Sequence, residues 1–148
     1  MDYYDCIDYD YVLFEIVRED VDKRATDFNR QFWTVAKHLK ASADVDDNLL
    51  SFKVGENLLY IKKSNSVAEI KDCLTAVKNL VGQIQNKQYL TQRNMKKEMG
   101  ETKNLLNKLS LLLKLKKEKK IGKVLEELNL SCDEMFACVD PYLKELHA

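Results

Sequence analysis

Helix-breaking residues are scarce in this chain, whose 148 residues include four glycines and one proline. Glycine and proline are the residues that helix interiors tolerate least, so their scarcity permits long uninterrupted helices. The charged fraction of 32% exceeds the usual quarter, whereas the apolar fraction of 45% is ordinary for a globular protein. We therefore expect an all-α protein with a single domain spanning residues 1–148.

Targeting and metal-binding signals are also missing from the sequence. It contains no run of about eighteen apolar residues, and its acidic, tyrosine-rich start differs from the basic start of a signal peptide. We expect a cytoplasmic or nuclear protein that is neither secreted nor membrane-spanning. The four cysteines form no CxxC pair, and the chain has only two histidines. We therefore expect free thiols, with no metal site and no cofactor.

No catalytic motif stands out. No serine or cysteine forms a recognisable set with His38 or His147 and a carboxylate, and there is no glycine-rich phosphate loop. Adjacent acids such as Glu126 and Glu127 fall on different faces of a helix and indicate solvated charge. We expect a protein that is not an enzyme and has no catalytic residues.

The strongest positive signal is a stripe of residues spaced three and four apart. This heptad spacing puts its members on one side of a helix, which must be buried against another helix. The stripe is apolar at both ends and polar in the middle. Its members are Val67, Ile70, Leu74, Val77, Val81, Ile84, Gln88, Thr91, Met95, Glu98, Thr102, Leu105, Leu109 and Leu112.

The stripe predicts one long coiled-coil-type helix over residues 66–120, opened by a capping box of Ser66 and Glu69. We favour a single helix because the heptad phase continues across Gly100. The alternative is a turn at Gly100 between two antiparallel helices, over about 66–99 and 101–120. Residues 121–148 are expected to form short C-terminal helices, the last one opened by Asp140 and Pro141.

Residues 1–62 divide into three segments. Residues 1–10 alternate acids with tyrosines and are expected to form an arm. Residues 11–42 predict a helix, with Trp33 beside its stripe, half buried or at an interface. Residues 49–62 are ambiguous, and the alternation before Gly55 favours a small β-hairpin over a continued helix. The stripe of the first helix consists of Val21, Ala25, Phe28, Phe32, Val35 and Leu39.

The zero net charge conceals an uneven distribution. Residues 1–50 carry −6, residues 86–123 carry +9, and residues 124–148 carry −5. The acidic ends can fold back on the basic middle, or each region can meet a partner of opposite charge. The basic region includes a lysine-rich segment formed by Lys114, Lys116, Lys117, Lys119 and Lys120.

The lysine-rich segment has a plain interpretation as a solvated helix end, where cations favour the helix dipole. It also fits an anionic surface, supplied by lipid, nucleic acid or an acidic protein. The absence of arginine and of interleaved aromatic residues argues against sequence-specific nucleic-acid recognition. A membrane-surface contact stays open as a weaker alternative.

Three functional hypotheses follow. The first is a scaffold subunit of a cytoskeletal, kinetochore or vesicle-tethering type of assembly, which binds a protein partner as a homo- or hetero-oligomer through helix packing. The second is a compact monomeric bundle that regulates a signalling or host protein by binding a helix in a groove. The third is an anionic-surface binder that uses the lysine-rich segment. The partner interface of the first hypothesis comprises Val67, Ile70, Leu74, Val77, Val81, Ile84, Leu105, Leu109, Leu112, Phe28, Phe32 and Leu39.

Overall fold

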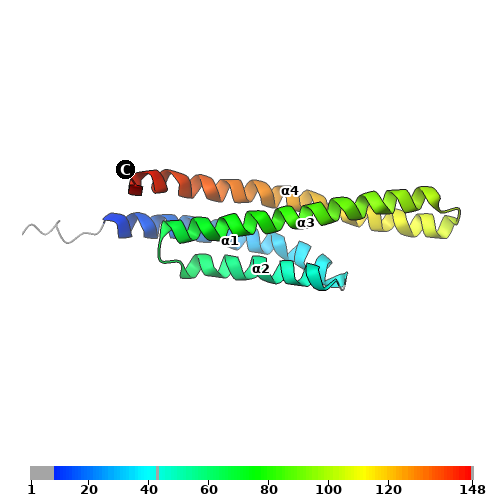
Figure 1. Cartoon of the computed structure of the whole chain (residues 1–148), viewed down its shortest axis with the longest axis horizontal. Coiled ribbons are helices and arrows are strands. Elements are labelled where there is room, and N and C mark those ends of the chain that lie inside the picture. The colour runs from blue at the N-terminus through cyan, green and yellow to red at the C-terminus, as the bar shows by residue number, and fades with distance from the viewer. Residues whose placement is uncertain (1–8, 43, 148) are drawn as a thin grey trace, which may run out of the picture.

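The structure is a computed structural model and describes residues 9–42 and 44–147. The expected acidic arm therefore lies almost entirely outside the described residues. Four α-helices follow one another, and each runs opposite to the one before it (Figure 1). They are α1 (Tyr9–Ala41), α2 (Val45–Lys63), α3 (Val67–Glu101) and α4 (Leu105–His147). The all-α prediction is confirmed, because the described part of the chain is a helical bundle without strands.

The helices form a bundle in which α1 contacts α2 and α4, and α3 also contacts α2 and α4. Contacts between α1 and α3 are few, so these two helices lie across the bundle from each other. The prediction for residues 11–42 is confirmed by α1. All six residues of its stripe are at most 4% exposed, and Trp33 beside them is 50% exposed.

The far end of α3 and the start of α4 project beyond the other two helices (Figure 1). Near this end, α1 meets α4 where His38 contacts Glu118, and α2 meets α3 where Asp47 contacts Lys87. We call the part beyond these contacts, residues 93–117, the tip. A pair of helices buries only one face of each member, so among the described helices none covers the outer faces of the tip.

The β-hairpin expected at residues 49–62 is wrong, because these residues belong to α2. The Asp44 side chain caps this helix by accepting hydrogen bonds from the backbone N–H groups of Asp46 and Asp47. Val54, Leu58 and Ile61 then follow at helical spacing and are at most 7% exposed. The cap and the buried helical stripe together outweigh the local alternation that favoured strands.

The single helix over residues 66–120 is also wrong. The chain breaks at residues 102–104, just after Gly100, and α3 and α4 pack antiparallel as in the alternative that was not favoured. The Asn104 side chain accepts a hydrogen bond from the backbone N–H of Leu106 at 3.0 Å, which starts α4. The predicted start of α3 is confirmed, since Ser66 accepts from the N–H of Glu69 at 3.2 Å.

The short helices expected over residues 121–148 are instead the continuation of α4, which runs to His147. Asp140 does not cap a new helix, because α4 continues through it; its carboxylate lies 3.1 Å from the ammonium group of Lys71. Pro141 lies inside α4 near its end. A proline there removes one hydrogen bond of the helix, and the buried residues that precede it keep the helix on the bundle. These buried α4 residues are Leu125, Leu128, Cys132, Met135 and Val139.

Candidate functional site

Nine of the twelve residues expected at a partner interface lie in the core of the bundle. Each of them is at most 3% exposed. They belong to the hydrophobic cluster that the chain's own helices form, so a partner reaches them only if the bundle opens. The nine are Val67, Ile70, Leu74, Val77, Val81, Ile84, Phe28, Phe32 and Leu39.

The other three, Leu105, Leu109 and Leu112, lie on the exposed side of α4 in the tip. Their exposed fractions are 70%, 50% and 47%. Leu106 and Leu113 join them with 75% and 71% exposed. We call these five residues the leucine face.

The start of α4 is apolar on a second side as well. Leu111 and Leu115 are only 9% and 6% exposed, and they occupy the side of α4 that is buried in the tip. A helix that is apolar on several sides is normally enclosed on all of them. In this chain one side is buried, and the leucine face has no partner among the described residues.

Basic residues border the leucine face. Lys116 and Lys119 line a shallow hollow of about 540 Å³ together with Leu109, Leu112 and Leu113. Residues 93–117 contain eight lysines and arginines against two glutamates. The exposed apolar surface therefore lies within a strongly positive part of the molecule.

The lysine-rich segment does not form a single patch. Whereas Lys116 and Lys119 border the leucine face, Lys117 and Lys120 turn toward α1. There they line a different hollow of about 510 Å³ with Arg30, Lys37 and Trp33. We call this second hollow the cationic hollow. Lys114 is exposed and lines neither of them.

A buried polar contact lies next to the cationic hollow. The His38 Nε2 atom of α1 is 2.8 Å from the Glu118 Oε1 atom of α4, and the two side chains are only 12% and 9% exposed. Gln92 of α3 donates a hydrogen bond to the backbone oxygen of Glu118 at 3.2 Å. This contact therefore joins three helices where the bundle meets the tip.

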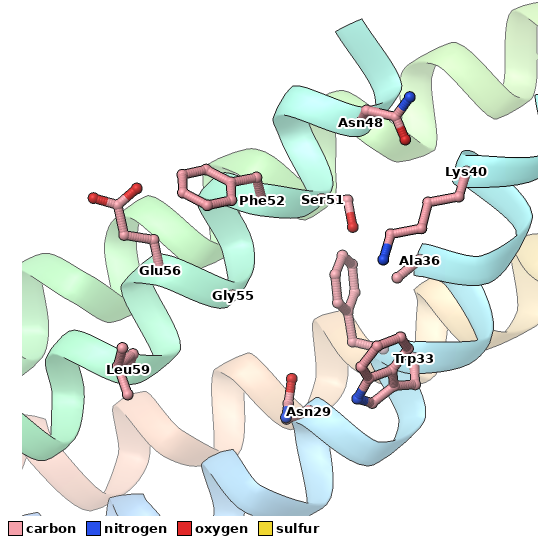
Figure 2. Close-up of a pocket in the computed structure, with 11 residues that line it drawn as sticks. Asn29, Trp33, Ala36, Lys40, Asn48, Ser51, Phe52, Gly55, Glu56 and Leu59 are labelled. Atoms are coloured by element: carbon pink, nitrogen blue, oxygen red, sulfur yellow. The ribbon is translucent and has the colours of Figure 1, made fainter. Parts of the chain in front are cut away.

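A third hollow runs between α1 and α2 (Figure 2). It measures about 630 Å³, and Trp33 on α1 and Phe52 and Leu59 on α2 stand around it. Small residues, including Ala36 and Gly55, also line it. We call it the aromatic groove.

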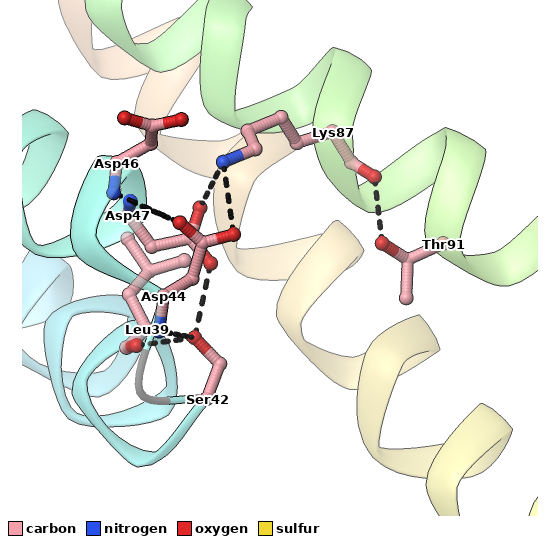
Figure 3. Close-up of polar contacts among 7 residues, drawn as sticks. All are labelled: Leu39, Ser42, Asp44, Asp46, Asp47, Lys87 and Thr91. Atoms are coloured by element: carbon pink, nitrogen blue, oxygen red, sulfur yellow. Dashed lines mark hydrogen bonds and ion pairs between the residues drawn. The ribbon is translucent and has the colours of Figure 1, made fainter.

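The turn between α1 and α2 is held onto α3 by Lys87 (Figure 3). Its ammonium group is 2.7 Å from Asp47 Oδ1 and 3.5 Å from Asp44 Oδ2. The hydrogen bond to Asp47 raises the pKa of Lys87. The N–H of Asp46 and, more weakly, Lys87 lower the pKa of Asp44. Both shifts mean that folding favours the charged forms.

Cysteine thiols and potential metal ligands are the remaining chemistry-bearing groups of the described residues. Cys73, Cys132 and Cys138 are free, as expected, and Cys6 lies outside the described residues. Burial raises the pKa of Cys132 to about 12, with a further contribution from Asp133, so it stays a protonated thiol at neutral pH. Within residues 9–42 and 44–147 no cluster of three potential metal ligands occurs. No helix in the same ranges is long and apolar enough to cross a membrane.

Comparison with known proteins adds no functional assignment, because the chain matches no protein-family model, no curated protein and no solved structure. The leucine face, the cationic hollow and the aromatic groove are therefore the candidate functional surfaces of the described residues.

Two of these surfaces, the aromatic groove and the cationic hollow, were not predicted from the sequence. The aromatic groove needs α2 to be helical, because only then do Phe52, Gly55 and Leu59 line the same side. The cationic hollow needs α1 and α4 to run antiparallel, which brings Arg30 and Lys37 next to lysines that follow about eighty to ninety residues later. The groove could have been predicted from the sequence only if residues 45–63 had been assigned as one continuous helix.

Proposed function

We propose that this chain is a non-enzymatic helical scaffold subunit of the cytoplasm or nucleus. It docks a partner helix on the leucine face of α4 by coiled-coil-type packing. The partner helix has an apolar side and acidic flanks. The observation that carries the proposal is the exposure of five neighbouring leucines, each at least 47% exposed, within a basic tip.

The apolar contribution comes from the leucines. Burying a leucine side chain completely is worth about 1.5–3 kcal/mol. Each residue of the leucine face can still gain roughly half of that free energy or more when a partner covers it, since between 47% and 75% of its surface is exposed. Contiguous apolar surface of several hundred Å² is uncommon on monomers and usually marks an interaction site.

The charge of the tip decides between partners. Two copies of the tip would bring two strongly positive surfaces together, and like charges across an interface oppose association. A helix whose acidic residues flank its apolar side instead meets Lys116 and Lys119 with complementary charge. The leucine face therefore favours an acidic helical partner over a second copy of itself.

The test uses two synthetic amphipathic helices, with leucines at heptad a and d positions and either glutamates or lysines beside them. Each is titrated into the full chain by calorimetry. We expect the acidic helix to bind and the basic helix not to bind. The double variant L109Q/L112Q should weaken the binding of the acidic helix at least about tenfold, since two apolar contacts are lost.

The matched control is L49Q/L130Q, which changes two exposed leucines outside the tip, 48% and 64% exposed. It should bind the acidic helix as the unaltered chain does. Equal binding of the two helices, or equal loss in the variant and its control, would count against the proposal. Binding of vesicles of anionic lipid through the leucine face, without binding of the acidic helix, would replace the partner helix by a membrane surface.

The aromatic groove supports a second candidate function, regulation by helix-in-groove binding. Small residues along a groove let a helix approach closely, and exposed aromatic residues are frequent anchors of binding. A Cβ atom at Gly55 would meet no atom within 4 Å, and Gly55 lines the groove, so a side chain added there extends from open space toward the groove. Gly55→Leu should therefore leave the fold intact and block a helix that binds the groove, while sparing one that binds the leucine face.

A further inference from the structure

We propose that the cationic hollow between α1 and α4 binds a phosphorylated anionic ligand. Its lining includes Arg30 and Lys37 from α1, and Lys117 and Lys120 from α4. These cations come from distant parts of the sequence and converge on one hollow of about 510 Å³. The hollow lies apart from the leucine face, so this proposal does not depend on the docking of a partner helix.

The cations of this hollow have little compensating charge. Arg30 makes one ion pair, with Asp27 at 3.8 Å, and both side chains are more than three-quarters exposed. Such an exposed pair contributes little. In the described part of the chain, Lys37, Lys117 and Lys120 make no ion pair.

The Glu118 carboxylate, which contacts the lining residue His38, is held inside the bundle. Glu118 faces His38, which also lines the hollow, through a contact of 2.8 Å. It is 9% exposed and is held between helices, so it is not free to pair with the surface lysines. Four cations near one another repel, and an anion with several charges relieves this repulsion.

The lining favours phosphate over a simple carboxylate. Arginine offers planar paired donors and lysine a mobile point charge, and together they suit the oxygens of phosphate groups. Trp33 adds an apolar wall to the hollow. The hollow therefore fits a compact ligand with more than one phosphate group and a ring or chain that contacts Trp33.

Trp33 is the single tryptophan of the chain and is 50% exposed. Because Trp33 lines both the cationic hollow and the aromatic groove, a change in its fluorescence is assigned to the cationic hollow by its loss in a variant of Lys117 and Lys120. The probes are inorganic tripolyphosphate, inositol hexakisphosphate, and vesicles containing a phosphoinositide. Each is titrated into the full chain at low salt, with sodium sulfate as a divalent anion that carries no phosphate.

We expect tripolyphosphate or inositol hexakisphosphate to change Trp33 emission saturably, and sulfate to have a much smaller effect. The variant K117Q/K120Q should weaken this binding roughly tenfold or more, because two of the four cations are lost. The control variant K96Q/K97Q removes the same charge from exposed positions in the tip, and it should change binding less than twofold, since it leaves the hollow intact. Circular dichroism of each variant verifies that the helices remain.

The two sources of phosphate are separated by the probes. Saturable binding of a soluble phosphate compound identifies a free ligand, whereas binding of the phosphoinositide vesicles alone identifies a lipid headgroup, and both support the site. An equal loss in K117Q/K120Q and in K96Q/K97Q would show attraction by overall charge and overturn the proposal. The absence of any saturable response to all three probes would overturn it as well.

Discussion

Two leucines of the tip, Leu113 and Leu115, should respond oppositely to truncation. Leu115 is 6% exposed on the buried side of α4, and Leu113 is 71% exposed on the leucine face. They are two residues apart in one helix, so replacing either by alanine changes helix propensity equally. Any difference between the variants therefore arises from what the side chains contact.

The expected magnitudes follow from burial. Truncation of a buried leucine to alanine costs about 2–5 kcal/mol, and a site in a two-helix hairpin can collapse partly, so we expect about 2 kcal/mol for Leu115→Ala. Leu113→Ala should change the free energy of unfolding by less than about 0.5 kcal/mol. The two effects should be reversed for binding of the acidic amphipathic helix. Leu113→Ala should weaken the binding free energy by about 1 kcal/mol, and Leu115→Ala should weaken it much less.

The assay is urea unfolding followed by circular dichroism, paired with calorimetric titration of the acidic helix. Because the tip can unfold before the bundle, hydrogen exchange of the amides of residues 105–117 is measured in both variants. Equal destabilisation by the two substitutions would refute the assignment of the two sides of α4. A larger loss of binding in Leu115→Ala than in Leu113→Ala would refute the leucine face as the docking surface.

Three further predictions concern the bundle itself. Lys87→Gln should lower the free energy of unfolding by about 1 kcal/mol, because Asp47 is 11% exposed and loses its cation, whereas Lys97→Gln should change it little. Since the pKa of Lys87 is raised, its contribution should be complete below the ordinary value of 10.5 and vanish as the pH rises through the raised one, so the two unfolding curves should converge in strong alkali. Glu118→Ala should cost about 1–3 kcal/mol, measured by urea unfolding, because the contact with His38 joins α1 to α4 at 2.8 Å; a change below about 0.5 kcal/mol would contradict this. Gly55→Ala should raise the midpoint of thermal unfolding, since this helical glycine has open space beside it and alanine is favoured by about 1 kcal/mol; a lower midpoint would contradict it.

The sequence predicted the helices whose buried stripes are unambiguous. The residues from Val21 to Leu39 repeat at three and four, and no other set of residues in that segment gives an alternative stripe. The same holds for Val67 to Ile84, where the capping pair also marks the start. In such segments, burial of one stripe determines the local structure.

The buried side of the leucine-rich residues 105–115 could not be predicted in this way. Leucines occur on two sides of residues 105–115, so a heptad can be traced through Leu109 and Leu112 or through Leu111 and Leu115. The first tracing continues the phase of α3 and suggested one long helix. The antiparallel packing selects the second, and only the three-dimensional arrangement shows which leucines are left exposed.

In the C-terminal half of α4, tertiary packing overrides a local signal for the start of a new helix. Asp140 followed by Pro141 is a common helix start, yet here tertiary contacts of Met135 and Val139, both fully buried, continue the helix through the proline. Likewise, the glycine and the alternating residues of α2 suggested strands, and the cap at Asp44 with the buried stripe behind it overrode them. Local signals were right where they agreed with burial and failed where packing opposed them.

The central claim is that the leucine face of α4 docks an acidic helix. The most direct measurement is leucine methyl NMR of the full chain during titration with the acidic amphipathic helix. We predict shifts of the methyl signals of Leu105, Leu109, Leu112 and Leu113, and none at Leu49 or Leu130. Shifts confined to Leu59 in the aromatic groove, or no localised shifts at all, would contradict the claim.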